Sequence, residues 1–403
     1  MRRGLKRRFH SEKRCFKPEN RAFLAQILLN HRGIARSDNH LAALPPAGAG
    51  VDKVKVRTET LFMEGDVKYC GIDLHGNNNW VVIIDDHDRV VYSRRHANDL
   101  SRLLPVLAVH RSELSGIVVE STFNWYWLVD GLQEAGYRVL LANTAAIKQY
   151  EGLKQRGDES DARQLAHLLR LGLLAEGYIM PKAMRAIRDL ARKRMQLVQQ
   201  RTAQILSIES SLSRHCGWKL SSNRIKCLYQ ADLDEMKLEA LPLRGVQANV
   251  AVLQALQTQI ENLEEVLADY CRGEAGYPLL RTVSGIGEVL ATVILLETGN
   301  VERFADAGHY ASYCRCVGSV YLSNGKKKGE GNSKNGNRYL AWAFVEAANF
   351  AVRHCEPARR FYQRKKAKRN SIVAIKAVAH KLARACYHML KTQQPFCVER
   401  CFT

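Results

Sequence analysis

The sequence predicts an α/β domain followed by a mostly helical remainder. Strand-like runs of β-branched and aromatic residues gather between residues 66 and 180, whereas residues 181–272 show almost no strand pattern. The last section, 273–403, has shorter helical patterns around a glycine-rich stretch. With 403 residues, the chain has room for about two to four domains.

The expected α/β domain starts with three strand-like runs, Val67–Leu74, Trp80–Asp85 and Val90–Arg94. Turn residues separate these runs, so we predict a three-stranded meander. The elements expected next are a helix at Leu100–Val109, a strand at Gly116–Glu120, a helix at Trp125–Ala135, a strand at Arg138–Ala142, and helices at Ala145–Leu153 and Ser160–Leu171. This order is compatible with a mixed sheet covered by helices on both faces.

Two long helices are expected in the middle of the chain. Ala183–His215 and Gln247–Cys271 carry apolar residues three to four positions apart, with charged residues and glutamines between them. We predict that the two helices pair, either as a coiled-coil arm or as part of a bundle. Their length favours an arm that acts as a spacer.

The last section is predicted to contain helices and a basic loop. Leu279–Glu297 has the pattern of two helical runs that meet at Ser284-Gly285-Ile286-Gly287. Further helices are expected at Tyr339–His354 and Ser371–Leu390. Between them, Ser323–Arg338 is rich in glycine, lysine and asparagine, which favours a flexible loop.

An excess of positive charge indicates the class of partner. The chain has 61 Lys and Arg against 40 Asp and Glu, a formal net charge of +21, so nucleic acid is the first expected partner. No run of about 18 uncharged apolar residues occurs, which argues against a membrane partner. The basic start is followed by no secretory segment, and the 11 scattered cysteines favour reduced thiols in the cytosol.

Residues 1–65 fall outside the expected domains. Residues 1–17 contain eight Lys or Arg and one acid, and Leu41–Gly50 has the composition of a linker. One interpretation is a basic arm that grips phosphate. The other, which the composition favours, is a poorly ordered extension, with Met63 as the alternative start.

Four carboxylates lie at the ends of predicted elements. Asp73 and Glu120 each end a strand, and Asp158 and Asp161 are three residues apart where a helix begins. Turn chemistry or the helix dipole explains each one separately, but the four together are a rarer coincidence. Because strand ends meet at a crevice of a mixed sheet, we expect these side chains to hold a pair of Mg²⁺ ions for phosphodiester chemistry.

Other residues are candidates for contact with nucleic acid. The backbone at Gly285 and Gly287 can approach a phosphate, as in a helix-hairpin-helix grip, although a helix C-cap explains Gly285 equally well. Phe361 and Tyr362 interleave with cations in the run 353–369, which favours a nucleic-acid surface. The cations expected to bind are Lys326, Lys327, Lys328, Lys334, Arg338, Arg364, Lys365 and Lys366.

Six segments resemble a known family. They are YCGIDLHG (69–76), IVVEST (117–122), DESDAR (158–163), SGIGEVLA (284–291), RFADAGHYASYCRCV (303–317) and KNGNRYLAWAFVEAANFAVR (334–353). The first three are similar to the acidic blocks of a RuvC-like nuclease domain, and the others to its partner transposase domain. From about Tyr69 to Phe396 the chain resembles the DEDD-type transposases of the insertion sequence 110 family, in its 1111-like subgroup, which also includes the Piv DNA invertases.

The resemblance implies a RuvC-like, ribonuclease-H-type fold in which Asp73, Glu120, Asp158 and Asp161 bind Mg²⁺. Members of the family cut and rejoin DNA strands at the ends of their element and at its target. They are guided by a bridge RNA and act as dimers and tetramers.

The resemblance also implies a composite site, in which a serine of the C-terminal domain joins the carboxylates. By its position in the motif this serine is Ser323. Asn324 stands where the family often has serine or glycine, so Ser333 stays the weaker candidate. The sequence shows no His–Asp pair next to either serine that would activate it.

Three other functions are open alternatives. GIDLHG (71–76) resembles the first phosphate loop of actin-like ATPases, which would suit a sugar or acetate kinase, but the helical middle and the basic charge disfavour it. A non-catalytic nucleic-acid-binding protein would also have a strongly basic sequence, but it would not cleave DNA. A Holliday-junction-type nuclease would use a similar acidic site but leaves the C-terminal section unexplained.

Overall fold

The computed structural model gives the placement of most of the chain. The residues that it describes are 67–144, 146–147, 157–234, 238–318, 321–329 and 335–402. Contacts divide the chain after Met63, and all the elements below belong to the unit 64–403. The extension 1–65 lies outside the described residues, as does the helix expected at Ala145–Leu153 apart from 146–147.

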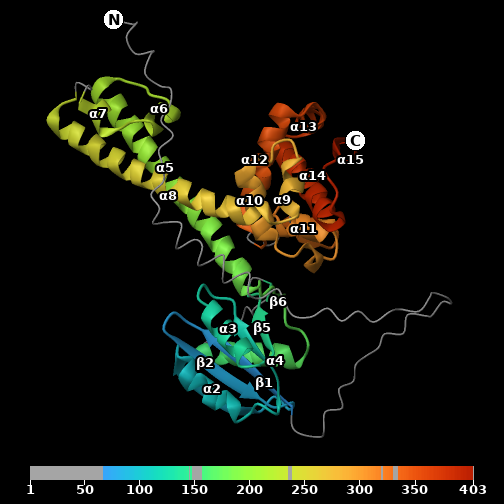
Figure 1. Cartoon of the computed structure of the whole chain (residues 1–403). Helices are drawn as coiled ribbons and strands as arrows, with labels where there is room; N and C mark the ends of the chain where they lie inside the picture. The colour runs from blue at the N-terminus through green and yellow to red at the C-terminus, as the bar shows by residue number, and fades with distance from the viewer. Residues whose placement is uncertain are drawn as a thin grey trace, which may run out of the picture. The chain divides into compact units, whose positions relative to one another are not determined.

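A six-stranded mixed sheet forms the first part of the unit (Figure 1). Its strands are β1 (Lys68–Leu74), β2 (Asn78–Ile84), β3 (Val90–Ala97), β4 (Leu114–Glu120), β5 (Val139–Ala142) and β6 (Glu176–Gly177), in the order β3-β2-β1-β4-β5-β6. β1 runs antiparallel to β2 and parallel to β4. The predicted meander of β1 to β3 is confirmed, whereas β6 is too short to have produced a periodic signal.

The two faces of the sheet follow from the alternation of side chains along each strand. On one face, Cys70, Ile72 and Leu74 share a buried cluster with α2 (Leu100–Ala108) and α3 (Tyr126–Glu134). The opposite face is covered by α4 (Asp158–Arg170), whose buried alanines and leucine pack against β2, β4 and β5. The prediction of helices on both faces is therefore confirmed.

A glycine in β1 allows α4 to lie directly on the strand. A Cβ at Gly71 would be 2.0 Å from the carbonyl oxygen of Ala162 and 2.7 Å from the backbone nitrogen of Ala166. Only a residue without a side chain permits this backbone contact. The first turn of α4 is thereby held close to the carboxyl end of β1.

The middle of the chain is helical, as predicted. α5 (Lys182–Cys216) and α8 (Ala240–Arg272) pack along one another. The short helices α6 (Ser222–Lys226) and α7 (Gln230–Asp234) pack with them around a small core of their own. α8 begins earlier than the expected Gln247, because Pro242 lies in the first helical turn, where its missing N–H breaks no hydrogen bond.

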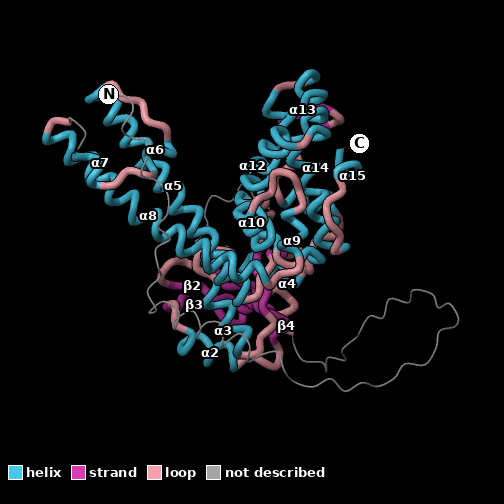
Figure 2. Tube along the Cα trace, turned by 45° about the horizontal axis from the view of Figure 1, so that its top comes forward, coloured by secondary structure: helices cyan, strands magenta, loops and turns pink. Residues whose placement is uncertain are grey.

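Helices also make up most of the C-terminal part (Figure 2). They are α9 (Gly276–Arg281), α10 (Glu288–Thr298), the 3-10 helix η1 (Val301–Arg303), α11 (Ala307–Tyr313), α12 (Arg338–His354), α13 (Glu356–Lys368), α14 (Ser371–Thr392) and α15 (Val398–Phe402). α14 packs against most of the others and lies at the centre of the largest buried cluster. No helix among the described residues combines the length and the apolar character needed to cross a membrane.

The first part of the predicted loop Ser323–Arg338 belongs to a hairpin, whereas residues 330–334 lie outside the described residues. β7 (Tyr321–Ser323) pairs antiparallel with β8 (Lys326–Gly329). Asn324 and Gly325 form the turn between them with positive φ angles of 50° and 71°. Asn-Gly is a strong two-residue hairpin signal, and the glycine and lysine content of the surrounding stretch obscured it.

We expect Gly71→Ala to lower the free energy of unfolding by about 3 kcal/mol, since the added methyl group meets rigid backbone atoms of α4. Chemical denaturation and hydrogen exchange of β1 would measure the loss. The matched control is Gly76→Ala, because a Cβ at Gly76 has no atom within 4 Å. Equal stability of the two variants would contradict the proposed close contact.

Candidate active site

Asp73 and Glu120 lie side by side at the ends of two parallel strands. Ile72 pairs with Val119 in the parallel register of β1 and β4, so the next residue of each strand follows at the same edge. Ile72 and Val119 belong to the cluster on the α2 and α3 face. By alternation, Asp73 and Glu120 point to the other face, where α4 begins.

The first turn of α4 brings two further carboxylates to the same place. Asp158 and Asp161 are three residues apart and share one side of the helix. Gly157 caps this helix in an extended conformation, with its backbone N–H donating to the Ser160 hydroxyl at 3.0 Å. Acidic residues are favourable at a helix N-terminus, which helps to offset their mutual repulsion.

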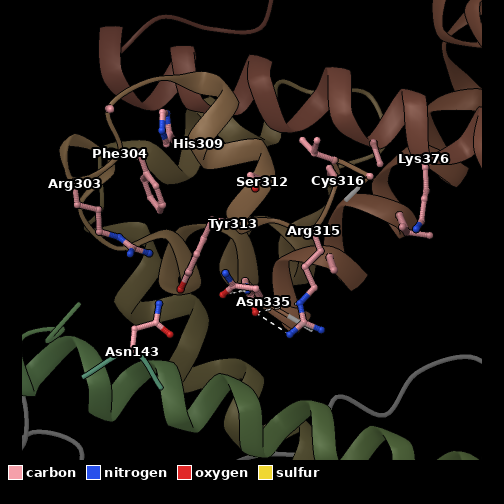
Figure 3. A pocket seen from close by; sticks show the side chains of 17 residues that line it. Asn143, Arg303, Phe304, His309, Ser312, Tyr313, Arg315, Cys316, Asn335 and Lys376 are labelled. Atoms are coloured by element: carbon pink, nitrogen blue, oxygen red, sulfur yellow. Dashed lines mark hydrogen bonds between the residues drawn. The ribbon is translucent and has the colours of Figure 1, made fainter. Parts of the chain in front are cut away.

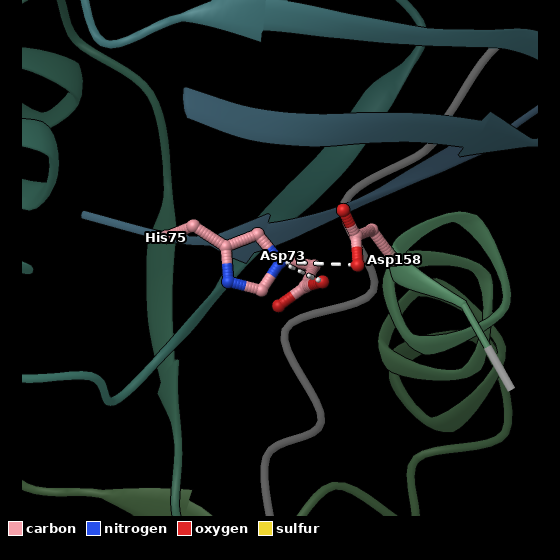
Figure 4. A group of neighbouring side chains, drawn as sticks. All are labelled: Asp73, His75 and Asp158. Atoms are coloured by element: carbon pink, nitrogen blue, oxygen red, sulfur yellow. Dashed lines mark ion pairs between the residues drawn. The ribbon is translucent and has the colours of Figure 1, made fainter. Parts of the chain in front are cut away.

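A histidine bridges two of the carboxylates. Nε2 of His75 lies 3.1 Å from Oδ2 of Asp73 and 3.2 Å from Oδ1 of Asp158 (Figure 4). The Asp73 side chain is only 5% exposed, whereas those of His75 and Asp158 are each 43% exposed. The group therefore has a buried base and an open rim, as a site for a solvent-borne ligand requires.

Glu120 shows how strongly the acidic groups interact. Burial is the first cause that raises its pKa to about 8, and a hydrogen bond with Asp73 and the charges of Asp73 and Asp161 contribute to the same rise. Glu120 is therefore mostly protonated at neutral pH and can donate to Asp73. Through these contacts and the shared His75, the structure brings together all four carboxylates that the sequence singled out.

His75 is a site residue that sequence reasoning missed, because it was interpreted as part of a turn. The signal was its spacing: it follows Asp73 by two residues at the end of β1, so both side chains point to the same face.

The residues fit a divalent cation. The atoms that Asp73, His75 and Asp158 could offer to a metal ion lie within 4.8 Å of one another. Burial first, and then the nearby carboxylates Asp73 and Asp161, raise the pKa of Glu120, and a bound cation would favour its charged form. Carboxylate oxygens are the ligands that Mg²⁺ prefers, whereas an imidazole nitrogen such as that of His75 is more typical of transition metals.

The two glycines between α9 and α10 have different surroundings. Gly285 has a φ of 105°, and a Cβ there would be 2.6 Å from the carbonyl oxygen of Ala347 and 2.7 Å from the nitrogen of Ala351. This turn is packed onto α12. Gly287 precedes α10, and a Cβ added to it would meet no atom within 4 Å. The Gly287 side of the turn therefore has the open space that a phosphate would need.

Ser323 ends β7 beside the hairpin turn. It is partly exposed and pairs across the hairpin with Lys326, and Lys326 and Lys328 are exposed. None of the hydrogen bonds and ion pairs among the described residues links Ser323 to the carboxylates. Ser333, Lys334 and the side chain of Lys327 lie outside the described residues.

A cavity of about 800 Å³ lies beside Arg303, Tyr313 and Arg315 (Figure 3). Gly318, which precedes the hairpin, and Gly336, which follows it by seven residues, line the cavity together with Arg303 and Arg315. Nε and Nη2 of Arg315 donate to the carbonyl oxygen of Gly336 at 3.1 and 2.8 Å. Arg315 therefore holds together the two ends of the segment that carries Ser323.

The remaining predicted cations lie on exposed helix surfaces. Arg338 begins α12 with its guanidinium 4.9 Å from the centre of the Tyr339 ring, and it lines a cavity with Arg192 and Trp342. Exposed positions on α13 are held by Arg364, Lys365 and Lys366. Phe361 is only 8% exposed and packs in the core, so the predicted role of this aromatic ring at a nucleic-acid surface is wrong. Sequence spacing alone did not show that α13 buries this position.

Comparisons with known proteins relate two regions of the chain to transposases. One family profile, described as "Transposase", matches residues 70–216, which include the four carboxylates. A second, described as "Transposase IS116/IS110/IS902 family", matches residues 277–363, which include Ser323. Together the two matches span more than half of the chain.

Two curated proteins are similar in sequence. The transposase for insertion sequence element IS1111A of Coxiella burnetii is 23% identical over 301 residues, which cover 72% of this chain and 79% of that protein. The uncharacterized 43.6 kDa protein of insertion element IS110 from Streptomyces coelicolor is 31% identical over 117 residues, 29% of each chain.

Without metal, the stability of the protein should depend on the titration of Glu120. Its pKa is about 8 in the fold against an ordinary value of 4.5, so the folded state binds more protons between these values. The free energy of unfolding should then fall as pH rises from about 5 to about 8. In Glu120→Gln this fall should be smaller, and above about pH 8 the variant should be the more stable protein.

The measurement is chemical denaturation in EDTA across this pH range. The control is Glu134→Gln, which changes an exposed glutamate of α3. If Glu120→Gln kept the full pH dependence of the parent, the strong coupling of Glu120 to its neighbours would be refuted.

The two glycines of the α9–α10 turn should respond differently to substitution. We expect Gly285→Ala to destabilise the protein by about 2 kcal/mol or more, since it combines a positive φ with a backbone clash. Gly287→Ala should change stability by less than about 0.5 kcal/mol. Thermal unfolding tests both, and a stable Gly285→Ala variant would contradict the packing role.

Proposed function

This chain belongs to the IS116/IS110/IS902 family of transposases, and we propose that it cuts and rejoins DNA strands to excise and insert an insertion sequence. The observation that carries the proposal is the cluster of four carboxylates at the ends of β1, β4 and the start of α4. Such a cluster suits phosphodiester chemistry, and the net charge of +21 suits a nucleic-acid substrate.

In this proposal the sheet is a RuvC-like, ribonuclease-H-type domain, and Asp73, Glu120, Asp158 and Asp161 hold two Mg²⁺ ions. Bound Mg²⁺ would supply Lewis-acid polarisation of the scissile phosphate. Asp73 anchors the site from its buried position. Asp158 and Asp161 close it from the solvent side, where the DNA strand would enter.

Ser323 is the proposed nucleophile. Its hydroxyl oxygen would form an ester with phosphorus while the bond from phosphorus to one strand oxygen breaks. The hydroxyl proton leaves to solvent or to a neighbouring base, and the released strand oxygen takes up a proton. The cut strand stays attached to the protein until exchange reverses the step. Lys326, opposite Ser323 in the hairpin, can contact the phosphate.

The rest of the C-terminal part would hold the nucleic acid. The turn at Gly285 and Gly287 would act as a helix-hairpin-helix-like grip, with most of its phosphate contacts on the Gly287 side. The cations proposed to contact the backbone are Lys326, Lys327, Lys328, Lys334, Arg338, Arg364, Lys365 and Lys366. We further propose a bridge RNA as guide and a homodimer or tetramer as the working assembly.

A plasmid that carries the element with its flanking DNA and the adjacent RNA-coding stretch tests this function. We expect Asp73→Asn to lower recombination by on the order of 1,000-fold while DNA binding persists. Ser323→Ala should yield no covalent protein–DNA adduct under denaturing conditions, whereas Ser333→Ala should behave as the parent.

Other outcomes would contradict the proposed function or favour one of the alternatives. Parental recombination by Ser323→Ala would remove the serine from the mechanism, and cleavage by Asp73→Asn would remove the carboxylate site. A parent protein that binds DNA without cutting it in Mg²⁺ would be the non-catalytic alternative. A parent that cuts branched junctions but never rejoins strands would be the junction nuclease.

A further inference from the structure

A basic groove runs between α14 and the C-terminal segment 394–401, and none of the residues that line it belongs to the sites described above. It encloses about 520 Å³. Gln393 ends α14 in a left-handed conformation with φ 53°, so the chain turns back along the helix. The backbone N–H of Phe396 donates to the Thr282 hydroxyl at 3.0 Å, which fixes the returning segment. The groove is therefore built into the fold.

Basic residues line the groove. Its cations are Lys381, Arg384 and Arg400, and His380 and His388 lie four residues before and after Arg384 on α14. Four residues of helix rise about 6 Å, which is similar to the separation of successive phosphates along one strand. The whole of α14 contains no acidic residue.

The groove contains residues of positive charge that form no ion pair with other described residues. Lys391 of α14 pairs with Glu302 at 3.4 Å, but no ion pair among the described residues involves His380, Arg384 or Arg400. Lys381 lies 5.4 Å from the centre of the Phe361 ring. Burial, followed by the charges of Arg384 and Lys381, lowers the pKa of His380. The nearby acid Glu399 accepts from the Cys397 thiol at 3.4 Å.

We propose that this groove binds the phosphodiester backbone of a nucleic-acid strand. The proposal rests on the function proposed above and adds a contact outside the second matched region, 277–363. Basic side chains that are spread along a groove suit a repeating anion better than a single phosphate, for which the donors would converge on one point. The groove thus extends the nucleic-acid surface from α13 to α14 and α15.

Binding of fluorescent oligonucleotides tests the groove. Single-stranded DNA and RNA of one sequence, and the DNA duplex, are titrated with Asp73→Asn protein in EDTA, so that no cleavage interferes. In this background, the double variant Arg384→Gln, Arg400→Gln should bind the strand that occupies the groove about tenfold more weakly. For a single strand, the slope of log affinity against log salt should become shallower by about 1.4.

The matched control removes the same charge elsewhere. Arg102 and Arg272 are exposed, and each pairs with an aspartate on its own helix or its cap, Asp99 and Asp269. Arg102→Gln with Arg272→Gln should change affinity by less than about twofold. Equal effects of the two double variants would mean that only total charge matters, and this would overturn the groove proposal.

A thiol in the groove gives a second readout that needs no arginine variant. Cys397 and Cys227 are both exposed, but only Cys397 lines the groove. Bound oligonucleotide should slow alkylation of Cys397 and leave Cys227 unchanged, as measured by mass spectrometry of peptides. Alkylation of Cys397 at an unchanged rate under saturating oligonucleotide would count against the proposal.

The DNA and RNA arms show which strand uses the groove. If the parent binds neither, the proposed function itself fails. If the parent binds and the groove variant binds equally with the same salt slope, only the groove inference fails.

Discussion

The burial of several carboxylates at one sheet edge is the constraint on which the candidate site depends. Burial contributes most to the raised pKa of Glu120, and repulsion from the charges of Asp73 and Asp161 adds to it. The contact between α4 and β1 at Gly71 keeps the acidic turn of α4 in place despite the repulsion. Several carboxylates close together favour the binding of a ligand with positive charge. A divalent cation therefore suits this site.

The sequence was sufficient where side-chain alternation and strand direction decide the geometry. Asp73 and Glu120 could be placed together because each ends a hydrophobic strand, and parallel strands end at the same edge. Asp158 and Asp161 could be placed on one face from their spacing alone. The meander, the paired helices and the turn between α9 and α10 are equally local in origin.

The sequence was insufficient where a contact joins distant segments. The sequence around Gly71 does not reveal its contact with the carbonyl of Ala162, because the two residues lie at opposite ends of the sheet domain's sequence. Phe361 lies in a very basic run, yet the packing of α13 on α14 buries it. The hairpin at 321–329 is a different case: the Asn-Gly signal was present, but composition was given more weight than turn geometry.

The bond from Arg315 to Gly336 has a consequence for how the protein can change over generations. This hydrogen bond joins the residues that follow α11 to the residues that precede α12. It therefore helps to hold the two helices in place independently of the segment between them. Residues can then be inserted or removed between these anchor points without disturbing the helical core. The length of the stretch between Arg315 and Gly336, which carries Ser323, can therefore change separately from the stability of the helices on either side.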